Sequence, residues 1–257
     1  TGVTFEVNMA TLGTSLPFLN YSSTFLSREK RREIYESLIK RNYLKQFNEE
    51  VIKTKSWTTC GEACLAVCKK VHLIKKKDYE PYTCNGPISG IFDMYSAEEI
   101  VSLADMYGFD AVEFGNIAGW ILECLKKEIL TKDDVGINVK FCFDADEFLE
   151  NQRKCSYANS LIIRNLANMI VSNYGIGKYI ANGMRIASKE LDKIFNERVK
   201  EKGVSFTDLA VYTPFGESGF TTPAPYWVVG LFAPLPIAVT LVKFNFGTKL
   251  FIISFAR

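Results

Sequence analysis

Three closely spaced cysteines constrain the fold of this chain more than any other feature of its sequence. Residues 58–70 read TTCGEACLAVCKK, so Cys60, Cys64 and Cys68 follow one another at equal steps of four residues. On one straight α-helix, Cys60 and Cys68 would lie about 12 Å apart at ~1.5 Å per residue, which is too far for convergence on one small metal cluster. Gly61 allows the chain to bend directly after Cys60, so a loop followed by a helical turn can bring the three thiols together.

The spacing leaves several roles open for these cysteines. Three thiolates that converge are typical of iron–sulfur ligation, which is the sharper hypothesis. A stripe of cysteines on a buried helix face is the structural alternative, because free cysteine is among the most buried residue types. A zinc site would require a fourth ligand, and Cys84 is the nearby candidate. A dithiol redox site is disfavoured because the sequence contains no C-x-x-C.

Overall composition narrows the possible partners and the setting. The chain has 257 residues with 31 basic and 29 acidic side chains, a balance that argues against a nucleic-acid binder. Seven cysteines are too few for a secreted disulfide scaffold of this length, so we expect a reducing, cytoplasmic setting. Lys243 and Lys249 interrupt the apolar C-terminal run, so no membrane span is expected. The opening TGVTFEVNMATLG, without an initiator methionine, suggests a fragment of a longer protein.

Periodicity and punctuation predict a mainly α fold. One helix is expected after a cap at Ser27. Another is expected from a capping box Ser96–Glu99 to about Tyr107, with a left-handed stop at Gly108. Further helices are expected over 114–129, 146–173 and 177–202. No alternating strand series is apparent. Beyond Gly203 the composition shifts to proline, glycine and aromatic residues. We therefore expect a helical domain over 1–203 and the beginning of another domain over 204–257.

Two acidic segments follow the cysteines. Glu80 lies in DYEPYTCNGP, which has the composition of a turn, and such a turn can hold a carboxylate at a pocket wall for acid–base chemistry. A solvated loop glutamate is the structural alternative. In DMYGFD, Asp105 and Asp110 flank Gly108, so their carboxylates could accept hydrogen bonds from an amino-substituted heterocycle such as a pterin. As plain structure, Asp105 ends one helix and Asp110 caps the next.

In order and spacing, these segments resemble the tungsten-dependent aldehyde:ferredoxin oxidoreductase family. The motifs are WTTCGEACLAVCKK, DYEPYTCNGPISG, DMYGFDAVEFGNIAGWILE, VYTPFGESG and YWVVGLFAPLPI, and the resemblance extends to about Ile237. Within the family, the chain resembles the branch that oxidises glyceraldehyde 3-phosphate. The resemblance implies the helical central domain of that fold plus the start of its third domain.

The resemblance also implies cofactors, partners and residue roles. The family holds a 4Fe–4S cluster beside a tungsten, or molybdenum, bis-pterin, and it passes electrons from an aldehyde to ferredoxin. The residues Cys60, Cys64 and Cys68 match three ligands of the cluster. The residues Asp105, Gly108, Phe109 and Asp110 match a pterin-binding motif, and Glu80 matches a glutamate with a proton-handling role near the metal. A small aldehyde would be the substrate, which is oxidised to its acid.

The sequence also departs from the family pattern. The family's fourth cluster cysteine lies in a second D-x-x-G-x-C motif, and no segment after Phe141 resembles it. The amino-terminal domain that forms the base of the cofactor site has no counterpart in this sequence. Two alternatives to an aldehyde oxidoreductase portion therefore stay open. One is a silent gene fragment that folds as a helical domain without cofactor, and the other is an iron–sulfur electron-transfer module.

Overall fold

The computed structural model describes residues 17–53, 71–72, 75–76, 79–212 and 217. All of them belong to one compact unit that spans Thr1–Thr221. The α-helices are α2 (Arg28–Ile34), α3 (Lys45–Phe47), α4 (Tyr79–Cys84), α5 (Met94–Tyr107), α6 (Ala111–Lys126), α7 (Ala145–Val171), α8 (Gly177–Ile180), α9 (Met184–Ile194), α10 (Asn196–Lys202) and α11 (Phe206–Leu209). Two short 3-10 turns, Ser22–Phe25 and η5 (Pro87–Ser89), and two π-helical segments, Tyr35–Leu44 and Asn48–Ile52, complete the helical elements.

The mainly α prediction is confirmed. Strand structure in the described part of the chain is limited to β1 (Val71–His72) and β2 (Lys75–Lys76), which pair antiparallel. None of the described helices combines the length and the low charge that crossing a lipid bilayer requires. The predicted domain boundary near residue 204 stays a prediction.

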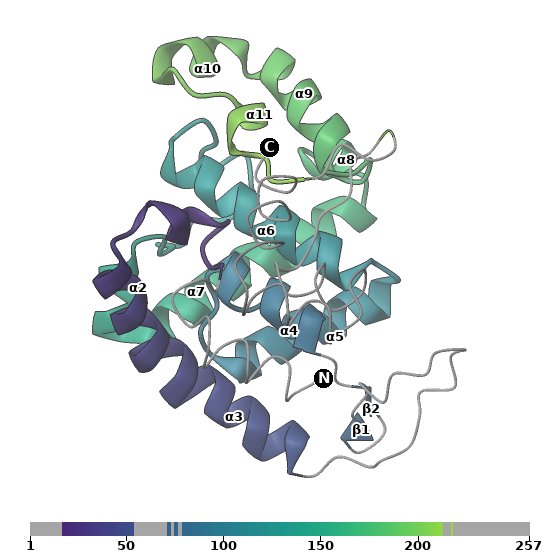
Figure 1. The fold of residues 1–257 in the computed structure, drawn as a ribbon. Coiled ribbons are helices and arrows are strands. Elements are labelled where there is room, and N and C mark those ends of the chain that lie inside the picture. The colour runs from purple at the N-terminus through teal and green to yellow at the C-terminus, as the bar shows by residue number, and fades with distance from the viewer. Residues whose placement is uncertain (1–16, 54–70, 73–74, 77–78, 213–216, 218–257) are drawn as a thin grey trace, which may run out of the picture. The chain divides into compact units, whose positions relative to one another are not determined.

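Helix α6 is the central element of the unit, and it contacts α4, η5, α5, α7 and α11 (Figure 1). Its sequence, AVEFGNIAGWILECLK, buries residues on almost every side, from Phe114 to Leu125. A helix that is apolar nearly all round is stable only when other elements surround it. The Trp120 side chain is fully buried on this helix, and its indole N–H donates to the Phe206 carbonyl oxygen at 3.0 Å. Helix α6 therefore organises the core.

Residues from both ends of the described unit meet on α6. Near the amino-terminal end, the Tyr21 hydroxyl donates to Asn116 Oδ1 at 3.1 Å. The Asn20 amide donates to Glu123 Oε2 at 2.6 Å and to the Leu209 carbonyl oxygen at 2.8 Å, across 189 positions of sequence. Burial raises the pKa of the Glu123 carboxyl, although its bond from Asn20 opposes that shift. These bonds connect the first and the last described segments through one helix.

Several predicted helix ends are confirmed. Ser27 caps α2, because its hydroxyl accepts from the Lys30 N–H at 3.1 Å. Gly108 ends α5 with φ +72°, a left-handed conformation that glycine adopts without steric penalty. Asp110 is the N-cap of α6 as expected, although the helix expected over 114–129 runs from Ala111 to Lys126. The helix predicted over 146–173 is present as α7, which starts one residue earlier, at Ala145.

Other predicted boundaries are wrong. The helix expected from a capping box at Ser96 instead begins at Met94, because the Asp93 carboxylate caps it and accepts from the Ser96 N–H at 2.9 Å. The single helix expected over 177–202 is three helices. The chain turns between α8 and α9 at Gly183, whose φ is +84°, and it leaves helical geometry again at Phe195.

Candidate functional site

The turn between α5 and α6 presents two carboxylates on either side of Gly108. We call Asp105, Gly108, Phe109 and Asp110 the acid corner. The Gly108 N–H donates to the Asp105 carbonyl oxygen at 3.2 Å, and the Phe109 N–H donates to the Ala104 carbonyl oxygen at 2.9 Å. These bonds close the end of α5 and fix the direction in which the chain enters α6.

The two carboxylates of the acid corner differ in how much of their bonding capacity is used. Asp110 Oδ1 accepts from the backbone N–H groups of Val112 and Glu113, both at 2.9 Å, and so caps α6. The exposed Asp105 carboxylate accepts no hydrogen bond from the residues that the structure describes. Acceptor oxygens at both positions are thus available to a ligand.

Phe109 belongs to a row of aromatic rings at the acid corner. Its ring centroid lies 5.6 Å from that of Tyr107 and 5.3 Å from that of Phe114, both in tilted arrangements. The Tyr107 hydroxyl donates to Asn168 Oδ1 at 2.9 Å, which connects the row to α7. Such contacts hold aromatic rings in defined positions. The position of Phe109 in the acid corner is therefore stabilised by its packing against two neighbouring rings.

Glu80 lies in the first turn of α4, where it is half-buried. The expectation that it stands in a turn is wrong, because residues 79–84 are helical and the turn follows at Asn85 and Gly86. Helix α4 packs against both α5 and α6, the helices that form the acid corner.

The electrostatic surroundings of Cys84 show which carboxylates gather around the end of α4. Burial raises the pKa of the fully buried Cys84 thiol, and the negative charges of Glu80, Asp110 and Glu113 raise it further. The Asn116 side-chain amide donates to the Cys84 sulfur, with 3.5 Å between Nδ2 and Sγ, and this hydrogen bond opposes the shift. The thiol is therefore held neutral. The pKa of this one buried thiol is thus raised by the charge of Glu80 and by the charge of Asp110 in the acid corner.

The predicted cluster ligands Cys60, Cys64 and Cys68 lie outside the described residues. Within the described ranges, no group of three or more histidine, cysteine, aspartate or glutamate side chains could hold a metal ion. The ligand assignment therefore stays a prediction.

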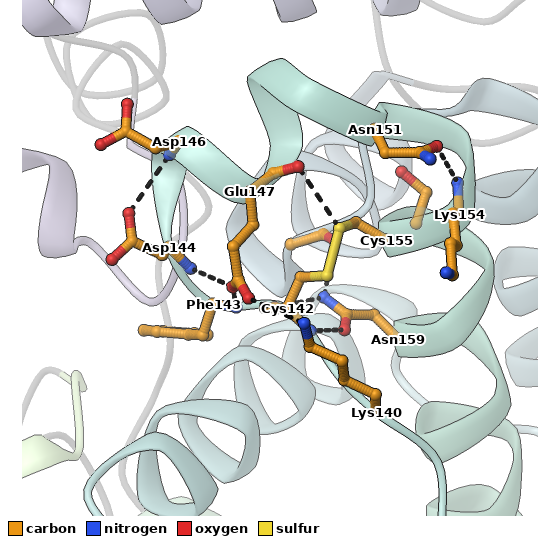
Figure 2. Close-up of a disulfide and its surroundings, with 12 residues drawn as sticks. Lys140, Cys142, Phe143, Asp144, Asp146, Glu147, Asn151, Lys154, Cys155 and Asn159 are labelled. Carbon is orange, nitrogen blue, oxygen red and sulfur yellow. Dashed lines mark hydrogen bonds and ion pairs between the residues drawn. A yellow bond between two sulfur atoms is a disulfide. The ribbon is translucent and has the colours of Figure 1, made fainter.

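A disulfide joins Cys142 to Cys155, with 5.3 Å between the two Cα atoms (Figure 2). It connects the segment before α7 to the body of that helix, beyond a bend at Asn151. Asn159 lies beside it: its amide exchanges hydrogen bonds with the Cys142 N–H, at 3.0 Å, and the Cys142 carbonyl oxygen, at 2.9 Å (Figure 2). The sequence analysis missed this pair, because two cysteines 13 positions apart show no recognisable pattern.

The acid corner fits the chemistry of a pterin. A pterin is a flat heterocycle with amino and ring N–H donors, and it needs acceptor oxygens that are spaced around its edge. Asp105 offers an exposed carboxylate without a partner among the described residues, and Asp110 offers the oxygen that its capping role leaves over. The neighbouring backbone N–H groups belong to the amino-terminal end of α6, a place that favours negative charge.

The comparisons with known proteins define the class. The model of the family described as "Aldehyde ferredoxin oxidoreductase, domains 2 & 3" matches residues 2–221, so the chain belongs to the aldehyde ferredoxin oxidoreductase family. The resemblance seen in the sequence motifs is thereby confirmed.

Individual relatives refine that placement. The chain is 40% identical over 238 residues to the glyceraldehyde-3-phosphate:ferredoxin oxidoreductase of Pyrococcus furiosus, a match that covers 92% of this chain and 36% of the relative. It is 38% identical over 242 residues to an uncharacterised protein of Methanocaldococcus jannaschii, covering 92% of this chain and 39% of that protein. A WOR-like subunit of an aliphatic sulfonate oxidoreductase of Pyrococcus furiosus is 26% identical over 168 residues, which is 62% of this chain and 23% of the subunit. The chain thus spans well under half the length of these relatives.

Proposed function

We propose that this chain forms the central part of an oxidoreductase that oxidises an aldehyde and passes the electrons to ferredoxin. The proposed substrate is glyceraldehyde 3-phosphate and the product is 3-phosphoglycerate. In forming the carboxylic acid, the aldehyde gains one oxygen from water and releases two electrons and two protons, and a third proton leaves when the acid ionises. The relative named for this reaction, which is 40% identical over 92% of the chain, supports the choice. With ferredoxin as the electron partner, the protein would act in the cytoplasm.

The acid corner is the observation on which the proposal chiefly rests. A turn at Gly108, whose φ is +72°, presents two carboxylates, and the packing of Phe109 against a neighbouring aromatic ring stabilises this turn. Asp105 and Asp110 would bind the N–H edge of a pterin, while the backbone around Phe109 would lie against it. When bound, a tungsten or molybdenum bis-pterin would supply the redox and oxygen-transfer chemistry that these side chains lack.

Two other groups of residues have proposed roles. Glu80, near the acid corner through the packing of α4 on α6, would hold or release a proton during oxidation of the aldehyde. The thiolates of Cys60, Cys64 and Cys68 would ligate a 4Fe–4S cluster that conducts electrons towards ferredoxin.

Metal analysis after anaerobic purification tests the proposal. This chain alone is expected to be incomplete and inactive, so the test uses the whole oxidoreductase of which it forms the central part. Cells grown with iron and tungstate should yield that protein with iron, acid-labile sulfide and tungsten, and it should reduce ferredoxin when glyceraldehyde 3-phosphate is added. Iron and sulfide without tungsten would replace the proposal with an iron–sulfur module. Absence of all three would indicate a silent fragment.

Variants of the acid corner sharpen that test. Asp105→Asn together with Asp110→Asn should lower the tungsten content at least tenfold, while the iron content is retained. Asp144→Asn is the matched control, because Asp144 caps α7 as Asp110 caps α6 but lies away from the acid corner. An equal loss of tungsten in both proteins would contradict the assignment of the pterin to the acid corner.

A further inference from the structure

Asn85 connects the helix that bears Glu80 to the helix that begins at Asp110. Its side chain is completely buried. The side-chain amide donates to the Pro81 carbonyl oxygen at 3.0 Å and to the Ala111 carbonyl oxygen at 2.7 Å. Pro81 directly follows Glu80, and Ala111 directly follows Asp110. One amide group therefore holds the backbone beside both candidate carboxylates.

The orientation of this amide follows from its neighbours. Both partners are carbonyl oxygens, which only accept hydrogen bonds, so the NH₂ end of Asn85 must face them. Asn85 Oδ1 is consequently buried without a partner among the described residues. A buried acceptor without a hydrogen bond lowers the stability of the folded protein. The position thus tolerates a cost in stability, which a side chain present only for stability would avoid.

The backbone of α6 at Gly115 packs directly against the chain at the end of α4. A Cβ atom added to Gly115 of α6 would lie 2.7 Å from the Asn85 nitrogen and 2.7 Å from the Cys84 oxygen, besides an even closer approach to the Cys84 carbonyl carbon. The backbones of α6 and of the end of α4 are therefore in direct contact. The hydrogen bond from the Asn85 side chain to the Ala111 carbonyl oxygen extends that contact to the amino-terminal end of α6.

We propose that Asn85 is a positioning residue that fixes Glu80 relative to the acid corner. The inference rests on the proposed function only in that Glu80 and the acid corner are taken as the reacting site. Asn85 acts through the backbone on both sides. Without its two hydrogen bonds, the first turn of α4 moves independently of the start of α6, and the distance between Glu80 and Asp110 is no longer fixed.

The free cysteines of the described residues report on this link without any cofactor. Cys84 lies at the contact between α4 and α6, and Cys124 lies near the other end of α6; both side chains are completely buried. A buried thiol reacts with an alkylating reagent only when its surroundings open. Local separation of α4 from α6 exposes Cys84, and a separate local opening at the other end of α6 exposes Cys124. Under native conditions such local openings occur far more often than global unfolding. The ratio of the two labelling rates therefore reports on the contact between α4 and α6 and not on overall stability.

The experiment measures alkylation by N-ethylmaleimide under native conditions, with each cysteine followed separately by mass spectrometry. Asn85→Asp keeps the shape of the side chain but sets carboxylate oxygens against two carbonyl oxygens, and Asn85→Ala removes the group. We expect the rate at Cys84 to rise about 10- to 100-fold in both variants, as the loss of about 1.4–2.8 kcal/mol of local stability predicts. The rate at Cys124 should change less than threefold.

Asn159→Ala is the matched control. Asn159 is also a completely buried asparagine that connects distant backbone segments, but it lies beside the disulfide. Its removal should leave the ratio of Cys84 to Cys124 labelling unchanged. If Asn85→Asp and Asn85→Ala leave that ratio unchanged as well, or raise both rates equally, Asn85 does not position α4 and the inference is overturned.

A second readout connects the link to the reaction. In the anaerobically loaded protein, the pH profile of aldehyde oxidation should shift in Asn85→Ala by at least half a pH unit, because Glu80 takes a new position while no charge is added. Asn159→Ala should keep the original profile. The proposed function and the positioning role of Asn85 fail separately. If metal analysis finds no tungsten in the protein, the proposed function is refuted whatever the labelling shows. A selective rise at Cys84 without a shifted profile would overturn the role of Asn85 in positioning Glu80.

Discussion

Two buried asparagines hold distant segments of this protein together, and they do so in different ways. Asn159 uses both ends of its amide: Oδ1 accepts from the Cys142 N–H, and the NH₂ group donates to the carbonyl oxygens of Cys142 and Gly90, all at 2.9–3.0 Å. Asn85 uses only its NH₂ group, and its Oδ1 stays without a partner among the described residues.

The difference distinguishes a region built for stability from one built for placement. The Asn159 network is complete, and the Cys142–Cys155 disulfide reinforces it covalently. The Asn85 link is incomplete, and it joins the two backbones that present Glu80 and Asp110. Complete polar networks rigidify a core, whereas buried acceptors without partners lower its stability. The disulfide region should therefore dominate global stability, and the Asn85 region should dominate local geometry.

The largest expected effect is on the disulfide side of this comparison. Asn159→Ala removes three hydrogen bonds to buried backbone groups and should lower the free energy of unfolding by about 3–4 kcal/mol. Urea denaturation, monitored by circular dichroism, measures this change. Asn85→Ala should cost less, about 2 kcal/mol, because it removes two hydrogen bonds together with an orphaned acceptor. A larger loss for Asn85→Ala than for Asn159→Ala would reverse the comparison.

The disulfide should contribute an amount similar to that of its neighbouring asparagine. Its cysteines are 13 positions apart, and closing a loop of this size stabilises a protein by about 3 kcal/mol through the unfolded chain. The double variant Cys142→Ser/Cys155→Ser should therefore unfold at lower urea concentration. Its Cys84 labelling under native conditions should match that of the parent protein. Selective exposure of Cys84 in this variant would show that the two regions are not separate.

The contact between α6 and α4 should be sensitive to one added methyl group. Gly115→Ala forces a Cβ atom against the Asn85 nitrogen and the Cys84 oxygen, so we expect a loss of about 2 kcal/mol from overpacking. Gly108→Ala is the matched control, because no atom lies within 4 Å of an added Cβ there. Its loss should be about 1 kcal/mol, from the left-handed backbone alone. Thermal unfolding compares the two, and equal losses would argue against steric contact at Gly115.

The smallest expected effects separate the two carboxylates of the acid corner. Asp110→Ala removes the cap of α6 and should cost about 1 kcal/mol. Asp105→Ala removes an exposed carboxylate that no described residue engages, so unfolding should change by less than about 0.5 kcal/mol. Denaturation of the cofactor-free protein measures both. A large loss for Asp105→Ala would mean that this side chain is structural.

Local sequence signals predicted much of the helical framework. Ser27, Gly108 and Asp110 were assigned correctly, because capping and left-handed stops depend on one or two residues and their immediate neighbours. The Ser96 cap was wrong for a related reason. Asp93, three positions earlier, is an equally good capping residue, and the pattern alone does not choose between them.

The link at Asn85 and the disulfide could not be predicted in this way. The hydrogen bond from Asn85 to Ala111 crosses 26 positions of sequence, and the bond from Asn159 to Gly90 crosses 69. Such contacts depend on how the helices pack and not on local composition. Glu80 was misplaced in a turn because DYEPYTCNGP is rich in turn-forming residues, whereas packing on α5 and α6 stabilises a short helix there.

The bonds that join Asn20 to Glu123 and to the Leu209 carbonyl have a consequence for how the unit folds during synthesis. Local helix pairs can assemble while the ribosome is still translating, but a closure across 189 positions must wait until Leu209 has emerged. Until then, α6 has no α11 to cover Trp120, and its apolar surface stays accessible to chaperones. A nascent chain halted shortly before this residue should therefore be degraded by proteases that spare the finished unit.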